Sequence, residues 1–192
     1  NPAYELVSSN QFEVARATVE NLYKMGFRRP AFVVDERIDD MVDGRFYGGF
    51  FRAQFAMPPS SRIEPFTENL ESPTYFDNLK KYIDDVQPDV IIYMLGKTGD
   101  FLYNHVRRKN GKRYPIVQLE RRNDCTIPKN VWSGMEQNNH IAGHLSVRRL
   151  ATLLNISSPH NQNSTTLIPP TWVASHYLKK EAEKIRNSTK DK

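Results

Sequence analysis

The apolar residues of this chain alternate between helical spacing and short continuous runs, beginning near the N-terminus. Asn10-Gln-Phe-Glu13 has the form of a capping box, in which the Asn10 side chain caps a helix and Glu13 reaches back to it. Gly26 is a natural C-terminal cap for the same helix. Between the two caps, residues recur at helical spacing, at Val14, Ala15, Thr18, Val19 and Leu22. The run Pro30-Ala-Phe-Val-Val34 follows, so the pattern predicts a helix and then a buried strand.

The same alternation continues through the middle of the chain. It predicts helices over residues 45–56, 72–86 and about 99–109, and buried strands over 90–94 and 115–119. Strands separated by helical segments form βαβ units, which place the strands parallel with right-handed crossovers. We therefore expect an α/β fold of three layers, in which helices flank a mostly parallel sheet.

The pattern is less regular after Glu120. Residues 131–134 have the character of a short extended segment, and residues 166–168 predict a strand near the C-terminus. Residues 177–192 have helical propensity only to about Arg186, and we expect them to form a tail. Residues 136–154 predict an amphipathic helix whose apolar stripe consists of Ile141, Leu145, Val147, Leu150, Leu153 and Leu154.

The composition is that of a soluble globular protein. The 192 residues are 39% hydrophobic and 26% charged, which is enough for one domain with a core and excludes wholesale disorder. No apolar run approaches the ~18 residues that span a bilayer, so we expect no membrane association. The net charge of +5 is too diffuse to indicate nucleic acid by itself. The single Cys125 excludes an internal disulfide and favours a reducing compartment, the cytoplasm.

Catalytic and metal-binding motifs are weak in this sequence. The run Gly-Lys-Thr-Gly at 96–99 lacks the glycine spacing of a phosphate-binding loop, and Trp-Ser-Gly-Met at 132–135 is not a nucleophile elbow. His140 and His144 stand one helical turn apart and could bind zinc, but no third ligand is evident and no glutamate lies between them. We therefore expect no enzyme activity, no metal and no cofactor.

Polar side chains follow each predicted strand, where ligands bind in an open parallel sheet. Asp35 and Arg45 come after the first strand, Lys97 after the second and Glu120 after the third. These four residues are therefore predicted to share one crevice. Arginine and carboxylate groups can both form bidentate hydrogen bonds with hydroxyl pairs such as those of a sugar. The alternative is that they are solvated loop charges.

Several segments, in order, resemble the lactose-repressor family of bacterial transcription regulators. The family has a helix, a glycine-containing turn with two basic residues and a strand, followed by an Arg-x-x-Gly-Phe motif and a Gln-(Asp/Asn) motif before a long helix. Each match is weak alone, whereas their order and spacing over residues 5–176 are specific. The matching segments are SSNQFEVARATVENLYKMGFRRPAFVV, RFYGGFFRAQ, PDVIIYMLG, RYPIVQLERRN, WSGMEQNNHIAGHLSVRRLATLL and TTLIPPTWVASH.

The resemblance implies roles for individual residues. Arg45 matches the effector-binding arginine of the family, and Glu120 stands where the family has an effector-binding aspartate. Asn138 lies beside the glutamine of the interlobe crossing. Leu95-Gly96 replaces the usual Asn-Asp pair, so Tyr93 or Lys97 is the candidate to replace that lost polar anchor.

The basic residues near the same edge bear on the class of effector. Arg121 replaces the second aspartate of the family motif, and Arg122 and Lys97 crowd the same edge. The resemblance implies a sugar effector, and these cations add a sugar acid or a sugar phosphate to the candidates.

The resemblance also implies the organisation of the chain. Residues 1–176 correspond to part of a periplasmic-binding-protein-like effector-binding and dimerisation domain, largely its second lobe together with the 136–154 crossover helix, and 177–192 to a tail. The DNA-binding headpiece lies outside this chain, so the implied partners are an effector, operator DNA through that headpiece, and a second copy. In the family this helix packs in the first lobe. We expect its stripe to be covered by swapping, rearrangement, a second copy or first-lobe residues.

Two other classes of function remain open at this point. A periplasmic solute-binding protein for a sugar transporter has the same fold and uses the same cleft. A signal peptide upstream would favour that class, whereas a helix-turn-helix upstream would favour the regulator. A small α/β enzyme would need a nucleophile or a metal cluster at the strand ends, and the sequence offers neither.

Overall fold

The computed structural model describes residues 5–122, 125–154 and 164–190. Helices and strands alternate along most of this length, which confirms the α/β class. In chain order the elements are β1 (Leu6–Ser9), α1 (Gln11–Met25), β2 (Pro30–Val33), α2 (Glu36–Asp40), α3 (Arg45–Phe55), a 3₁₀ turn (Pro59–Ser61), α4 (Tyr75–Val86), β3 (Val90–Tyr93), α5 (Gly96–His105), β4 (Ile116–Gln118), β5 (Ser133–Glu136), α6 (Asn139–Leu154), β6 (Thr165–Ile168), β7 (Thr171–Val173) and α7 (His176–Lys190).

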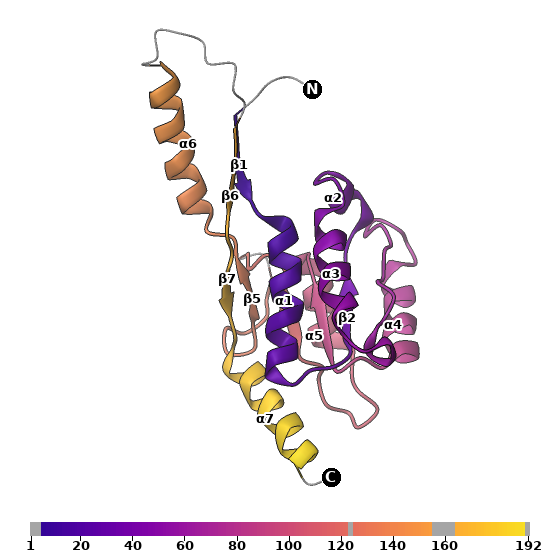
Figure 1. The fold of residues 1–192 in the computed structure, drawn as a ribbon. Helices are drawn as coiled ribbons and strands as arrows, with labels where there is room; N and C mark the ends of the chain where they lie inside the picture. Colours follow the sequence, from indigo (N-terminus) through magenta and orange to yellow (C-terminus); the bar gives the residue numbers. More distant parts are fainter. Residues whose placement is uncertain (1–4, 123–124, 155–163, 191–192) are drawn as a thin grey trace.

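The strands form two sheets of very different size. The larger sheet has the order β2-β3-β4-β5-β7, in which β2 to β5 are parallel and β7 pairs antiparallel with β5. The smaller sheet consists of β1 and β6, which run parallel. In Figure 1 this small sheet and α6 project together from one end of the main body. The structure therefore has one nearly complete layered lobe and a short projecting arm, which consists of β1, β6 and α6.

Helices cover both faces of the larger sheet, as the three-layer prediction requires. One apolar core joins α1, α3 and α7 to the sheet, and a second core joins α4 and α5 to its other face. The strands β2 and β3 are buried at every position because both of their faces are covered. In the first core, the rings of Phe32 and Phe50 stack with centroids 4.4 Å apart.

The Asn10 and Gly26 caps of α1 form as the sequence predicts, but Glu13 does not reach back to Asn10, because its carboxylate binds Arg16 and the Asn10 N–H donates to the Ile168 carbonyl. The Asn10 side chain accepts a hydrogen bond from the Glu13 N–H at 3.1 Å. Gly26 ends the helix with φ of 109°, a left-handed conformation that glycine adopts without a Cβ clash, and its N–H bonds to the carbonyls of Leu22 and Tyr23. Local hydrogen bonding therefore sets both ends of this helix.

The C-terminal segment differs from the predicted tail. Residues His176–Lys190 form one helix, α7, whose Leu178 and Ala182 are buried against the first core. These two residues are four positions apart and so share one helical face, which packs beside α1. The tail is thus an integral part of the lobe as far as the structure describes it.

Helix α6 is uncovered in the single chain. It begins at Asn139, close to the predicted start, and none of its residues is buried. Val147, Leu150 and Leu154 are exposed by 69%, 57% and 77%, whereas Leu145 is half-buried. The expectation that a second copy or further protein covers this stripe stays a prediction. Within the described ranges, no helix combines the length and the apolar character that crossing a membrane requires.

Glu5 connects the elements of the projecting arm, because it bonds Arg149 of α6 and Ser164 beside β6. The pKa of Glu5 tests these bonds. Its carboxylate pairs with Arg149 at 2.7 Å and accepts a hydrogen bond from the Ser164 hydroxyl. These bonds, that of Arg149 first, lower the pKa of Glu5 from 4.5 to about 2. The folded pKa is below the unfolded one, so the stabilising contribution is complete above pH 4.5 and is lost as the pH falls toward 2.

We expect a carboxyl-detected NMR titration to give Glu5 a pKa of about 2, and the amide protection factors of β1 and β6 to fall as the pH approaches that value. Arg149→Met should return the pKa of Glu5 toward its ordinary value. An unchanged pKa in this variant would show that the two side chains do not interact.

Candidate functional site

The parallel strands of the larger sheet end in one row. Val33 pairs with Tyr93, Tyr93 with Gln118, and Gln118 with Gly134, so the carboxyl ends of β2, β3, β4 and β5 lie side by side. The segments after these strands therefore emerge at the same edge. That edge faces the end of the molecule from which the arm projects (Figure 1).

The main lobe and the arm are joined by three crossings in the described chain, from β1 to α1, from β5 to α6 and from β6 to β7. Hydrogen bonds tie these crossings to one another. The Asn10 N–H donates to the Ile168 carbonyl at 3.0 Å. The Asn138 amide donates to the Pro169 carbonyl at 2.9 Å and to the Thr171 hydroxyl at 3.0 Å. The three crossing segments are thus joined by hydrogen bonds and lie beside the row of strand ends.

Glu120 is hydrogen-bonded to one of these crossing segments. Its carboxylate accepts a hydrogen bond from the Gln137 amide, and the Gln137 carbonyl oxygen accepts one from the Ser9 hydroxyl at 2.8 Å. Arg122 forms an ion pair with the same carboxylate. Glu120 is 7% exposed, so this side chain is held in one orientation at the crossing. Ser9, Gln137 and Glu120 together connect β1, β5 and the end of β4.

Arg45 occupies the first turn of α3, after the end of β2. Its side chain is 34% exposed, and its carboxylate neighbour is the exposed Asp43 at 3.5 Å, a long and weak ion pair. The start of α3 is fixed by the buried Asp39, which accepts a hydrogen bond from the Phe46 N–H at 2.9 Å. Burial raises the pKa of Asp39. Arg45 is therefore a half-exposed, weakly paired cation on a fixed helix start.

Asp35 has a structural role, unlike the binding role that the sequence suggested. Its side chain is fully buried and accepts hydrogen bonds from the N–H groups of Arg37 at 3.0 Å and Leu70 at 2.9 Å. Burial favours the neutral acid, but the bonds from Leu70 and Arg37 outweigh it and hold the pKa of Asp35 below its ordinary value. Asp35 therefore caps α2, a helix that the sequence analysis did not predict, and anchors the loop at residue 70.

The other candidates lie in three different settings. Tyr93 is fully buried in the second core, between α4 and α5, and so does not line the edge. Lys97 is exposed in the first turn of α5. Asn138 holds the crossings together, as described above, while its neighbour Gln137 contacts Glu120. Sequence reasoning identified the crossing motif, and the effector-binding role it suggested for Asn138 stays a prediction.

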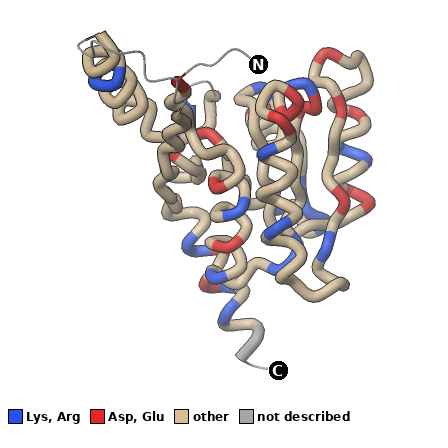
Figure 2. The backbone as a smooth tube through the Cα atoms, turned by 45° about the horizontal axis from the view of Figure 1, so that its top comes forward, with Lys and Arg blue, Asp and Glu red and all other residues tan. Residues whose placement is uncertain are grey.

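The two arginines after Glu120 are already paired. Arg121 forms an ion pair with Glu136 at 2.6 Å, and its guanidinium lies 4.3 Å from the centre of the Trp132 ring. Arg122 is paired with Glu120 itself. The acidic residues around α2 add negative charge at the other side of the edge, and Figure 2 shows Asp and Glu gathered at the upper right of the backbone. The expected excess of positive charge at this edge is therefore much reduced.

Metal binding finds no support at this site. Among residues 5–122, 125–154 and 164–190, no group of three His, Cys, Asp or Glu side chains is arranged to hold a metal ion. His140 and His144 are both exposed on α6. The groups that remain at the edge are hydrogen-bonding side chains.

Comparison with known proteins bears on the fold. No protein-family model and no curated protein matches the sequence. A LacI-family transcriptional regulator from Enterococcus faecium, solved with bound ribose, is similar with a TM-score of 0.68 and 17% identity, over 91% of this chain and 65% of that chain. This chain shares the fold of this LacI-family regulator. The layered lobe with its mostly parallel sheet matches that structure.

Two further structures extend the likeness to the LacI fold. Transcription regulator CcpA of Lactococcus lactis matches with a TM-score of 0.62 and 12% identity, over 86% of this chain and 61% of that chain. The lactose repressor bound to the anti-inducer ONPF matches with a TM-score of 0.63 and 15% identity, over 88% of this chain and 62% of that chain. The chain spans less than two thirds of the length of these proteins.

Proposed function

We propose that this chain is the effector-sensing part of a LacI-type transcriptional regulator and that it binds a sugar between its lobe and the arm. The observation that carries this proposal is the bonded set of Ser9, Gln137 and Glu120, which places a fixed carboxylate at the crossing between the two parts. Arg45 emerges at the same edge of the sheet, with only a weak ion-pair partner among the residues that the structure describes. No catalytic step is part of the proposed function.

The chemistry of the edge favours a neutral polyol. A carboxylate, an amide and a guanidinium supply both acceptors and donors for pairs of hydroxyl groups. Arg121 and Arg122 are neutralised by Glu136 and Glu120, so they do not recruit an anionic effector. The bound ribose in the Enterococcus faecium structure supports the same class of ligand for this fold.

The crossings supply the means of signalling. A ligand that contacts the lobe and the arm together stabilises one of their relative arrangements, in proportion to its difference in affinity for the two. In the proposed function, this shift alters operator binding through a DNA-binding headpiece carried by the longer protein. A second copy of the chain completes the regulator, and it or the remainder of the first lobe covers the exposed stripe of α6.

Thermal unfolding of the longer protein with a panel of neutral sugars, sugar acids and sugar phosphates tests this function. A ligand at 100 times its dissociation constant adds about 2.7 kcal/mol to the free energy of unfolding and raises the midpoint. We expect a neutral sugar to give this rise. Loss of a hydrogen bond to a charged group costs about 1.5–3 kcal/mol, so Arg45→Ala and Glu120→Gln should each weaken binding roughly tenfold or more.

Arg52→Ala is the matched control, because Arg52 is exposed at the other end of the same helix. This variant should bind the sugar as the original protein does. If Arg45→Ala and Arg52→Ala bind the sugar equally well, Arg45 does not contact the ligand. The absence of any shift with every sugar would refute the proposed function.

A further inference from the structure

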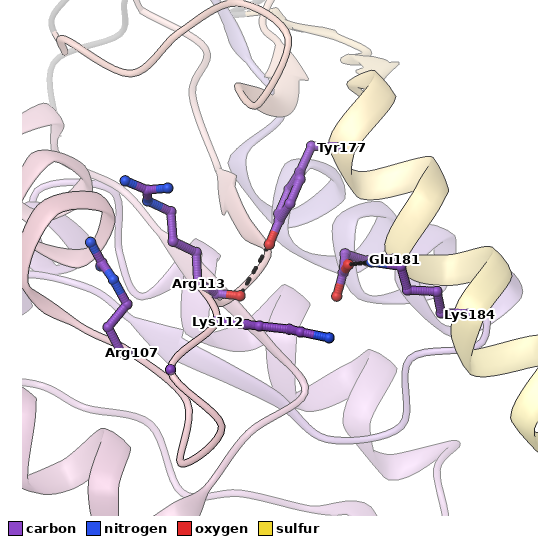
Figure 3. Close-up of a pocket in the computed structure, with 7 residues that line it drawn as sticks. Arg107, Lys112, Arg113, Tyr177, Glu181 and Lys184 are labelled. Atoms are coloured by element: carbon purple, nitrogen blue, oxygen red, sulfur yellow. Dashed lines mark hydrogen bonds and ion pairs between the residues drawn. The ribbon is translucent and has the colours of Figure 1, made fainter.

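The pocket at the opposite end of the lobe stabilises the fold and offers no built ligand site. It has a volume of about 320 Å³ and lies between the loop after α5 and the helix α7 (Figure 3). The Tyr177 hydroxyl donates to the Arg113 carbonyl at 3.1 Å, which binds the loop to α7. The guanidinium groups of Arg107 and Arg113 are turned away from α7 and donate to carbonyls of α5. The segment before Arg45 is built differently, because its buried polar groups lie next to a proposed sugar contact.

Residues 35–44 connect β2 to α3 and carry a buried carboxylate at each end of the short helix α2. Asp35 and Asp39 are 2% and 1% exposed. Asp35 accepts hydrogen bonds from main-chain N–H groups at the start of α2 and at residue 70, as described above. At the other end of α2, the Gly44 N–H donates to the Asp39 carbonyl at 3.0 Å, and Gly44 has φ of 70°, a conformation that favours glycine. The segment thus turns tightly between α2 and α3, and Asp39 closes the turn.

Helix α3 begins without a cap of its own. Gly44 occupies the N-cap position and has no side chain to accept a hydrogen bond from the first-turn N–H groups, which lack partners inside the helix. The Asp39 carboxylate takes this role from five residues before the cap position, because it accepts the Phe46 N–H at 2.9 Å. A Cβ at position 44 would lie 3.9 Å from the same carboxylate, so the group stands beside the cap position. A carboxylate also suits the positive end of a helix dipole, and Asp39 is therefore the cap of α3, supplied from α2.

The same hydrogen bond sets the position of Arg45. Arg45 directly precedes Phe46, and its own N–H donates to the Val42 carbonyl at 3.2 Å, so its main chain is fixed on both sides. Its side chain is only weakly held, because its ion-pair partner among the described residues is Asp43 at 3.5 Å. The direction in which the guanidinium leaves the helix therefore depends on the first turn of α3 and not on a side-chain partner.

We propose that Asp39 is a positioning residue of the sugar site, which holds the first turn of α3 so that Arg45 reaches the sugar. This inference rests on the function proposed above. Asp39 is 1% exposed, so it acts through Arg45 and does not itself contact the sugar. Without the Asp39 bond the first turn of α3 frays, and only the fraction of molecules with an ordered turn presents Arg45 for binding. Loss of Asp39 therefore lowers the affinity for the sugar by lowering that fraction.

Calorimetric titration of the longer protein with the neutral sugars of the unfolding panel (ribose, arabinose, glucose and galactose) measures this role. We expect Asp39→Ala to weaken sugar binding about fivefold, since a helix cap is lost and the ordered fraction falls. Asp39→Asn should bind within about twofold of the original protein, because its amide oxygen can accept the Phe46 N–H. Asp40→Ala is the matched charge control, because Asp40 is exposed on the same helix, and it should leave the affinity unchanged.

Two further variants and one measurement without sugar separate positioning from stability. Gln54→Met weakens α3 near its other end and lowers the free energy of unfolding, yet it should leave the affinity unchanged. In the Arg45→Ala background, Asp39→Ala should cause no further loss of affinity, because a positioning residue acts through the residue that it positions. Hydrogen exchange of the Phe46 amide should accelerate about tenfold in Asp39→Ala and stay slow in Asp40→Ala.

The outcomes distinguish this inference from the proposed function. If the original protein binds none of the sugars, both are overturned. If Arg45→Ala weakens binding but Asp39→Ala does not, the positioning role alone is overturned. Equal losses of affinity in Asp39→Ala and Gln54→Met, additive losses in the Arg45 double variant, or an unchanged exchange rate of the Phe46 amide would overturn it as well.

Discussion

Substitution of Gly49 by alanine is expected to lower the free energy of unfolding by about 3 kcal/mol, the upper part of the usual range for overpacking a core. A Cβ at position 49 would lie 2.1 Å from the carbonyl oxygen of Phe12 and 2.9 Å from its carbonyl carbon. These are backbone atoms of α1, so no side chain can rotate away to make room. The helices α1 and α3 would have to separate, which would open the first core.

Gly48→Ala is the matched control for this experiment. A Cβ at position 48 would meet the Phe12 ring at 3.5 Å, an ordinary van der Waals contact. Alanine is also the better helix former by about 0.5–1 kcal/mol, so this variant should be neutral or slightly more stable. Urea unfolding of both variants measures the difference. Similar midpoints for the two would show that α1 and α3 do not approach as closely as the structure has them.

The second large effect is expected from Gln118→Met, which should cost about 2–4 kcal/mol of the free energy of unfolding, since leaving buried polar groups unsatisfied is expensive. Gln118 is fully buried on β4. Its carbonyl oxygen accepts a hydrogen bond from the Trp132 indole N–H at 2.7 Å, and its amide donates to the Met94 carbonyl at 3.2 Å. Methionine has a similar volume but replaces neither bond.

Gln54→Met provides the comparison. Gln54 is also buried, but its amide makes one such bond, to the Ile63 carbonyl at 2.8 Å, so we expect about half the loss. Chemical unfolding gives both values, and the emission of Trp132 should shift in the Gln118 variant alone. A Gln118→Met protein as stable as the original would show that the indole finds another partner.

The local parts of the fold were predictable from the sequence, because their causes lie within a few residues. The side-chain cap at Asn10, the Gly26 cap and the runs that became β2, β3 and β4 depend on neighbours along the chain. The pairing of β1 with β6 depends on residues far apart in the chain, so the sequence predicted a strand at 166–168 but not its partner. The burial of Leu178 and Ala182 likewise follows from the face that α1 presents, which the charged sequence of α7 does not reveal.

In the candidate site, too, some features could be predicted from the sequence and others depend on the three-dimensional fold. The strand ends predicted the location of Arg45 and Glu120, because topology places such residues at one edge. The different contacts of Gln137 and Asn138 depend on the turn of the chain at the crossing, where Asn138 has φ of 55°. Asp35 was misassigned because a carboxylate after a strand can bind a ligand or cap a helix, and the short α2 is visible only in the structure.

The pairing within the small sheet has a consequence for synthesis on the ribosome. The four parallel strands of the larger sheet are complete once Glu136 has emerged, so most of the lobe can form while the chain is still growing. β1 is made before these four strands, yet its partner β6 lies about 160 residues downstream, and closing so long a loop is slow. β1 therefore waits for its partner until after the four parallel strands have been made, and until then its edge is open to any other nascent strand nearby.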